Sequence, residues 1–385
     1  MYNLYLLAIF SLSLFLVIKA LHYLPQSVPQ GRNVTLDAFR GLLAPLVLCH
    51  HFVLTYHFKV EGVWGLAKNK FVSNIGAIPV SMFFMITGYL FIGKICRNGI
   101  CWRELAVNRI LRIYPLFLFM LAVIYTVYFF HYHGSVTAEE FITSLLKALI
   151  FDLPALNGVE IASIISGAHW TLIYEAVFYL SLPVLALLNL KNLGARAVVY
   201  ASLPAVVLYN SYHTLGLIND LFALFAYGGL AYAIASSRFA YILRSKPMAY
   251  ISAITLVYAL FSSHYYTFKQ MFLISISFCC IAAGNDMFGL LKNRGLTKLG
   301  DISYSVYLTH GFILYALFTL SNFFPFMAVP EYIYYLLLPA IMALACGIAI
   351  ITYHYIESPF LALNAKLKAR LSRDDKGVSN TLKQG

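Results

Sequence analysis

Charged residues are scarce in this chain of 385 residues, where Asp, Glu, Lys and Arg make up 11% of the total. Soluble domains contain about a quarter of charged residues. Hydrophobic residues instead reach 61%, and aromatic residues 16%. This composition excludes an ordinary soluble domain and indicates a polytopic membrane protein, for which one integral domain accounts for the whole length.

Cysteine is also sparse, and its placement is uninformative about cross-links. Four of the six cysteines lie in apolar runs, and Cys96 and Cys101 lie in a basic loop. This spacing gives neither a disulfide framework nor a zinc motif, so we predict no metal site. The sequence also lacks a soluble domain, a low-complexity tract and an internal repeat.

About eleven apolar segments are long enough, or nearly so, to cross a bilayer. The predicted fold is therefore an all-α bundle of transmembrane helices. The connection 133–168 carries a further apolar run, KALIFDLPAL, which we interpret as interfacial or re-entrant. The predicted spans are residues 3–23, 36–57, 72–94, 113–132, 169–189, 196–210, 216–235, 248–263, 268–284, 302–324 and 334–357.

The positive charges predict the orientation of the bundle. Of 27 Lys and Arg residues, 22 lie in one set of alternating loops and in the C-terminal tail. Because cytoplasmic loops accumulate Lys and Arg, this bias predicts an external N-terminus and a cytoplasmic C-terminus. The formal charge of +12 is thus a topology signal, and we expect no nucleic-acid partner. The other set of loops holds only Lys59, Lys68, Lys70, Lys147 and Lys269.

Residues 1–23 have an alternative interpretation as a signal peptide. They lack a basic leading region and a clear cleavage site, and their removal would invert every later loop against the charge bias. We therefore expect a retained helix. The predicted organisation is an extra N-terminal transmembrane helix and linker (1–30), a membrane domain (31–363) and a basic cytoplasmic tail (364–385).

The stretch TLDAFRGLLAPLVLCHHF contains the first functional candidates, Arg40 and His51. Eleven positions are close to three helical turns, so both side chains share one face, about 16 Å apart along the axis. Ionisable groups in a bilayer are costly and are functional candidates by default. The structural alternative is a topology anchor at Arg40 and a packing role for His51. His50 lies about 80° around the helix from Arg40, which suits packing better.

A second group of basic residues precedes the fourth span in RELAVNRILRIYP. Arg109 and Arg112 are three residues apart, so they are neighbours on one helical face. Two adjacent guanidiniums can bind phosphate groups bidentately. Anchoring by the positive-inside rule and contact with lipid headgroups remain open alternatives.

Later spans carry further polar groups. Glu175 lies inside the run HWTLIYEAVFYLSLP, with Tyr179 one turn further on the same side. A buried carboxylate needs a partner or a raised pKa, and a structural ion pair is the alternative to a catalytic role. In GDISYSVYLTHGF, a hydroxyl, a phenol and an imidazole line one face, and a carboxylate follows near the end of the last span. These residues are Ser303, Tyr307, His310 and Glu357.

Taken in order, these stretches resemble the acyltransferase-3 family of integral membrane acyltransferases, which modify surface polysaccharides and related glycans. LDAFRG…HHF resembles the family's Arg-x10-His motif, and RILRIYP resembles its R-x-x-R-I-Y-P motif. PVSMFFMITGYLF, HWTLIYEAVFYLSLP, GDISYSVYLTH and YIESPF resemble later signatures, with Thr87 and Thr171 where serine is commoner. The additional N-terminal segment departs from the family's usual ten helices. The chain ends soon after Glu357, so we expect no esterase-like extracytoplasmic domain of the kind that some members carry.

The resemblance implies a membrane-bound O-acyltransferase of the bacterial cytoplasmic membrane. Its donor would be cytoplasmic acyl-CoA, acetyl-CoA by default, and its acceptor a glycan or a lipid-linked saccharide, with room for a separate extracytoplasmic partner. The implied catalytic residues are His51 as general base, Arg40, and Glu175 to orient His51 or to balance a guanidinium. A covalent acyl-histidine stays open. The implied donor-binding residues are Arg40, Arg109 and Arg112, and the implied substrate-binding residues are Trp170, Tyr179, Ser303, Tyr307 and His310.

A secondary transporter is the alternative from another class, because carriers also place His, Glu and Arg inside helices. Such proteins often consist of two similar halves. The absence of an internal repeat from the sequence favours the enzyme.

Overall fold

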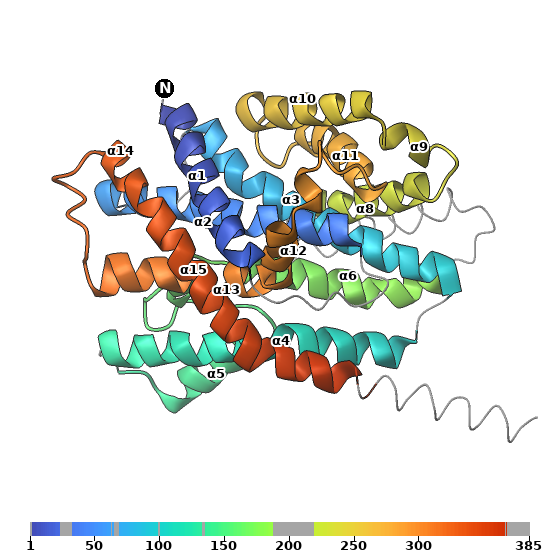
Figure 1. Cartoon of the computed structure of the whole chain (residues 1–385). Helices are drawn as coiled ribbons and strands as arrows, with labels where there is room; N and C mark the ends of the chain where they lie inside the picture. Colours follow the sequence, from blue (N-terminus) through green and yellow to red (C-terminus); the bar gives the residue numbers. More distant parts are fainter. Residues whose placement is uncertain are drawn as a thin grey trace, which may run out of the picture.

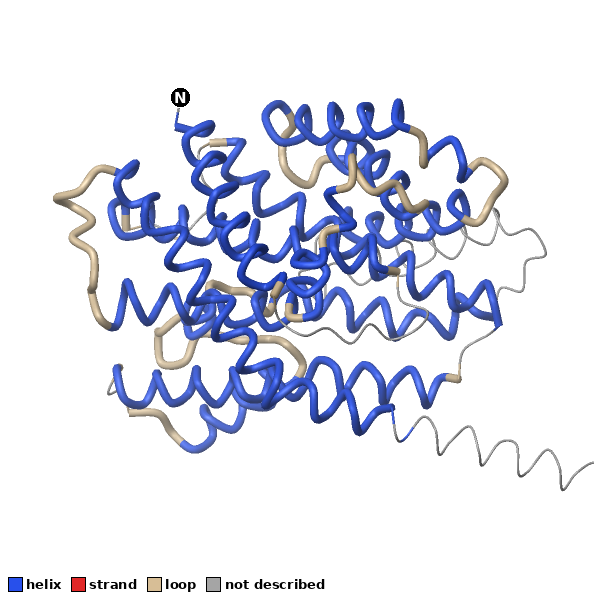
Figure 2. Tube along the Cα trace, in the orientation of Figure 1, coloured by secondary structure: helices blue, strands red, loops and turns tan. Residues whose placement is uncertain are grey.

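The computed structural model describes residues 2–23, 33–62, 64, 69–98, 101–132, 135–187, 219–365 and 367. This part of the chain is a bundle of helices without a strand, apart from an isolated bridge between Leu156 and Val159 (Figures 1 and 2). The predicted all-α fold is confirmed. The predicted span 196–210 lies outside the described residues.

The other predicted spans coincide with helices in the order expected. They are α1 (Tyr2–His22), α2 (Val34–Glu61), α3 (Lys70–Asn98), α4 (Trp102–His131), α6 (Trp170–Leu187), α8 (Phe222–Ala235), α10 (Lys246–Ser262), α11 (Phe268–Ala282), α13 (Ser303–Tyr315) with the π-helix Ala316–Leu320, and the helical run from α14 (Glu331–Tyr334) through the 3-10 turn Tyr335–Leu337 and α15 (Leu338–Thr352) to the π-helix Tyr353–Glu357. In the described residues, five helical stretches are long and apolar enough to cross a membrane: α1, α2, α3, α4 and Glu331–Ala365. The chain is therefore a multi-pass membrane protein.

Short elements connect the spans. They are α5 (Ala138–Leu149), a 3-10 helix Ile161–Ile165, a 3-10 turn Asn219–Leu221, α9 (Ala240–Leu243), a 3-10 turn Leu290–Lys292 and α12 (Arg294–Asp301). Helix α5 begins with a capping box, in which Thr137 and Glu140 satisfy each other's backbone donors. The run KALIFDLPAL spans the end of α5 and the following turn, where Phe151, Leu153 and Leu156 are buried.

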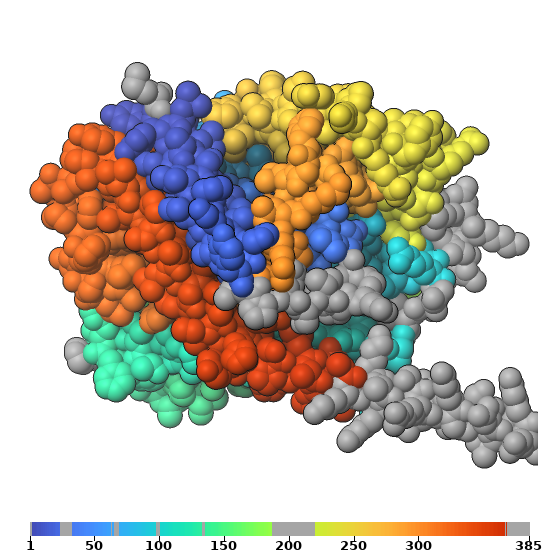
Figure 3. All heavy atoms as spheres, viewed as in Figure 1, coloured from blue at the N-terminus to red at the C-terminus, as the bar shows by residue number. Residues whose placement is uncertain are grey.

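Helices α2 and α3 form the centre of the bundle. Most of their residues are buried, whereas fewer than half of the residues are buried in the most apolar window of α1 and of α4. Helices α8, α10 and α11 cover one side of the centre, and α4 and α5 lie at the opposite side (Figure 1). Helix α1 lies on the surface beside α15 (Figure 3). Helices α6, α13 and α15, which carry polar motifs, contact α2 or α3, and α4 contacts α13.

Facing glycines bring two helix pairs into backbone contact. A Cβ atom at Gly88 on α3 would overlap the carbonyl oxygen of Phe225, and one at Gly228 on α8 would overlap that of Met85. Small residues allow this close approach of membrane helices. Gly41 and Gly300 do the same for α2 and α12. The start of α13 is thereby held beside the first turns of α2, which carry Arg40.

Candidate active site

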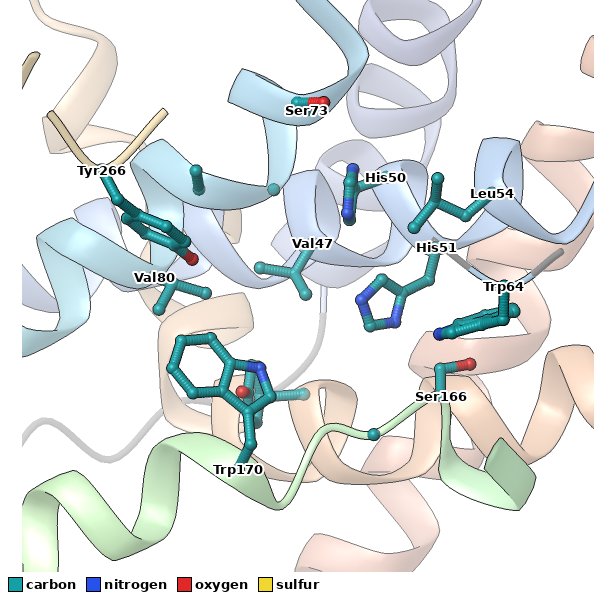
Figure 4. Close-up of a pocket in the computed structure, with 14 residues that line it drawn as sticks. Val47, His50, His51, Leu54, Trp64, Ser73, Val80, Ser166, Trp170 and Tyr266 are labelled. Carbon is teal, nitrogen blue, oxygen red and sulfur yellow. The ribbon is translucent and has the colours of Figure 1, made fainter. Parts of the chain in front are cut away.

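Two neighbouring cavities contain the polar motifs. The larger has a volume of about 790 Å³ and is lined by Arg40, Arg109, Arg112 and Glu175, among others. We call it the arginine cavity. The smaller, of about 350 Å³, is lined by residues around His50 and His51, and we call it the histidine cavity (Figure 4). Val80 and Tyr307 contribute to the lining of both cavities, so these two side chains form the wall between them.

Arg109 lies over two adjacent aromatic rings in the arginine cavity. Its guanidinium carbon lies 4.8 Å from the ring centre of Phe91 and 5.6 Å from that of Tyr179. Cation–π contacts of this kind fix the orientation of the guanidinium. Its Nε is buried and has no hydrogen-bond partner among the described residues. A fixed, buried guanidinium with a spare donor suits an anionic ligand.

Arg112, one turn further along α4, has a carboxylate beside it. Its Nη1 lies 3.6 Å from Oε2 of Glu357, which is buried in the π-helical turn after α15. Ser305 donates a hydrogen bond to Oε1 of Glu357, and Thr352 donates to Ser305 at 3.1 Å. The carboxylate near the end of the last predicted span is thus the counter-ion of an arginine in the cavity.

Glu175 belongs to the arginine cavity, and it does not line the histidine cavity. Thr87 donates to its Oε1 at 3.3 Å, and Tyr179 donates to its Oε2 at 2.7 Å. Because Tyr179 also lies beneath Arg109, the carboxylate is linked to that guanidinium through the phenol. This position favours the balancing of a guanidinium over the orientation of His51.

His51 has a second histidine as its partner. Its Nδ1 lies 3.1 Å from Nε2 of His310, and the edge of Trp64 faces its ring at 6.1 Å between centroids. The other ring nitrogen of His310 lies 3.2 Å from the carbonyl oxygen of Val306 in its own helix. His310 is fully buried, so its ring is held by these contacts and by packing.

His50 also lines the histidine cavity, but its ring is held by helix α3. Its Nδ1 lies 2.8 Å from the carbonyl oxygen of Val72 on α3. Gly76 makes room for the ring, because a Cβ atom there would lie within 2.8 Å of three of its atoms. His50 therefore ties α2 to α3 through a backbone contact, as the packing interpretation predicts.

Aromatic and small polar residues complete the histidine cavity. Trp170 at the start of α6 faces Tyr266 from the α10–α11 connection, and Trp64 lies beyond His51 (Figure 4). Ser166 and Gly167, both with positive φ, form the turn below His51. The site residues predicted from the sequence do not include Trp64, Tyr266 or the Ser166–Gly167 turn, because each lies in a connection with no periodic pattern.

The predicted substrate-binding residues divide between the cavities. Trp170 lines the histidine cavity, and Tyr179 and Ser303 line the arginine cavity, where the buried hydroxyl of Ser303 has no partner among the described residues. Tyr307 lies at the shared wall, and its hydroxyl is 2.9 Å from that of Thr171. His310 lies behind His51. Among the described residues, no group of three or more His, Cys, Asp or Glu side chains could hold a metal ion.

Comparison with known families identifies one match. A family model described as an acyltransferase domain, the acyltransferase-3 model, matches residues 33–354. The match extends from the residue before α2 into the π-helical turn after α15. It includes every residue that lines the histidine cavity, and all those of the arginine cavity except Ser358, Leu361 and Ala362. No curated protein and no solved structure shows significant similarity to the chain.

Proposed function

The chain belongs to the acyltransferase-3 family, and from this premise we propose that it transfers an acyl group from cytoplasmic acyl-CoA to a hydroxyl group of a surface glycan or lipid-linked saccharide. Acetyl is the default acyl group. The observation that carries the proposal is the pair of cavities, one rich in arginine and one containing His51, which meet at Val80 and Tyr307.

The arginine cavity suits the polyanionic donor. Arg109, held over two rings, would bind phosphate oxygens through its unpartnered Nε donor, and Arg112 would add charge while paired with Glu357. Arg40 lies about 16 Å along α2 from His51. This separation exceeds the reach of one side chain, so a phosphate contact suits Arg40 better than stabilisation of an oxyanion beside His51.

His51 is positioned to activate the acceptor. Its imidazole would take the proton from the acceptor hydroxyl while that oxygen attacks the thioester carbonyl carbon. When the carbon–sulfur bond breaks, the imidazolium would return the proton to the CoA thiolate. An acyl-histidine intermediate uses the same ring as nucleophile, and both routes give an ester and free CoA.

The histidine cavity suits the acceptor. Its lining combines the aromatic side chains of Trp64, Trp170 and Tyr266 with hydroxyl groups such as that of Ser166. Aromatic surfaces with a few placed polar groups are typical of small-molecule sites. In the orientation that the charge bias predicts, this cavity faces the exterior of a bacterial cytoplasmic membrane, where a separate extracytoplasmic partner could present the glycan.

Membranes containing the chain, incubated with radiolabelled acetyl-CoA and an acceptor glycan extract, test the proposal. We expect label in the glycan fraction with the unsubstituted chain and none above background with His51→Gln. Movement of solute without incorporation of label would instead support a carrier. The mass of surface glycan from a deletion strain and its parent would then identify the acyl group and the acceptor.

A further inference from the structure

His310 occupies a position that determines the protonation pattern of His51. It is fully buried; its Nδ1 faces the carbonyl oxygen of Val306 at 3.2 Å, and its Nε2 faces Nδ1 of His51 at 3.1 Å. A carbonyl oxygen only accepts hydrogen bonds. Nδ1 of His310 must therefore carry the proton of that ring.

The assignment of the second ring follows from the first. A neutral imidazole has one N–H, so Nε2 of His310 is an acceptor. Nδ1 of His51 must then carry a proton and donate it to His310. This leaves Nε2 of His51 without a proton, and its lone pair is the one available to the histidine cavity that His51 lines.

We infer that His310 is a positioning residue that fixes the reactive tautomer of His51. This inference rests on the proposed function and extends it, because it names the reactive atom as Nε2 of His51. The same lone pair serves a general base and a nucleophile, so the assignment holds for both routes. His50 does not compete for this role, because its Nδ1 faces the carbonyl oxygen of Val72 on α3.

A neutral imidazole at position 310 is also better suited than a carboxylate to the buried surroundings of His51. When Nε2 of His51 takes the proton of the acceptor hydroxyl, the imidazolium keeps its N–H bond to His310, which stabilises the positive charge. A carboxylate in the same place would be a buried charge before the reaction, which is costly without a counter-ion. Glu175 of the arginine cavity is bonded to Thr87 and Tyr179 instead.

Two substitutions of His310 test the inference, because both introduce a side-chain amide but place it at different distances from the backbone. The amide of His310→Gln ends near the former Nε2 and can accept from His51. The shorter amide of His310→Asn ends near the former Nδ1, so it can still bond to Val306 but does not reach His51. Both variants and the unsubstituted chain are reconstituted at full length in lipid nanodiscs and assayed with radiolabelled acetyl-CoA.

We expect kcat to fall by about a hundredfold in His310→Asn, which is the lower range for losing acid–base assistance. The KM for acetyl-CoA should stay within about twofold, because the donor binds in the other cavity, and His310→Gln should restore kcat to within about tenfold of the unsubstituted chain. Elution as a single species in size-exclusion chromatography excludes misfolding. Equal kcat for the Asn and Gln variants would overturn the assignment of His310 alone. Absence of transfer by the unsubstituted chain would overturn the proposed function and this inference with it.

Discussion

Nη1 of Arg112 lies 3.6 Å from Oε2 of Glu357, a carboxylate that is 1% exposed. That oxygen makes no hydrogen bond among the described residues, so the guanidinium is its electrostatic compensation. The pair joins α4 to the end of the last long helix. One residue of the arginine cavity therefore contributes both to folding and to the site.

These two contributions can be separated. Removal of one partner of a buried ion pair costs about 3–5 kcal/mol, so Arg112→Met should lower the thermal midpoint of unfolding markedly. Glu357→Gln in the same chain should restore the midpoint, because the uncompensated charge is gone. The affinity for acyl-CoA should stay low in the double variant. Recovery of both properties would show that Arg112 is purely structural.

Substitution of Arg109 should weaken binding of the acyl-CoA donor without the loss of thermal stability expected for Arg112→Met. Arg109→Ala removes a guanidinium that is held over two rings, and we expect the Kd for acyl-CoA to rise by about tenfold or more, the usual value of a charged hydrogen bond. Arg103→Ala, at an exposed position at the start of the same helix, is the matched control. The affinity for acyl-CoA can be measured by calorimetry in detergent. Equal affinities of Arg109→Ala and Arg103→Ala would contradict the phosphate-binding role. An unchanged affinity in the double variant Arg109→Ala, Arg112→Ala would contradict it as well.

The two adjacent histidines should respond differently to substitution. His51→Gln removes the group that faces the cavity, and we expect transfer to fall by at least about a hundredfold. His50→Asn keeps a donor near the position of Nδ1, so its contact with Val72 survives and transfer should stay within about tenfold. Initial rates with radiolabelled acetyl-CoA provide the comparison. Activity retained in His51→Gln would remove this residue from the chemistry.

The wall between the cavities should determine which lengths of acyl chain the protein can transfer. Val80 borders both cavities, so Val80→Ala would thin the wall between them, and Val80→Phe would thicken it. We expect the ratio of butyryl to acetyl transfer to rise in Val80→Ala. In Val80→Phe, transfer should fall while the affinity for CoA is kept, because the phosphates bind elsewhere. Unchanged chain-length profiles in both variants would show that the acyl group takes another route.

A native cysteine reports the orientation. Cys101 is exposed before α4, Cys96 is partly buried, and the other four cysteines are buried. In the predicted topology Cys101 is cytoplasmic, so a membrane-impermeant maleimide should label it only after permeabilisation of the cell. In a chain with Cys101→Ser and Ser135→Cys, the exposed position 135 lies in the predicted external connection and should label in intact cells. The opposite pattern would invert the proposed sidedness.

Periodicity and composition were sufficient for the helices that carry residues such as Arg40, His51 and Arg112, because a helix depends on contacts within one segment. The partners of these residues depend on helix register. His51 meets His310, and Arg112 meets Glu357, only because α13 and the last helix pack at one particular depth. Facing glycines such as Gly41 and Gly300 set that depth, and no single-chain periodicity reveals which glycine faces which backbone.

The placement of Glu175 and His51 in different cavities also depends on how the helices pack. Both residues occur at intermediate positions in their helices, so the sequence left two roles open for the carboxylate. The choice depends on the rotation of α6, which turns Glu175 toward Thr87 and Tyr179. The cavity positions of Trp64 and Tyr266 could not be predicted for another reason. Both residues lie in connections, whose sequences show no periodic pattern from which burial can be inferred.

The wall at Val80 and Tyr307 also has an electrical consequence. With polar cavities on both sides, most of the transmembrane voltage would fall across a few side chains, and each unit charge moved through the full field would require about 2.3 kcal/mol per 100 mV. Under the proposed function, a neutral acyl group would cross such a barrier without electrical work, while the charged phosphates of the donor would stay on their own side. The chain could thus modify an external acceptor with an internal metabolite and remain an insulator that preserves the ion gradients of the cell.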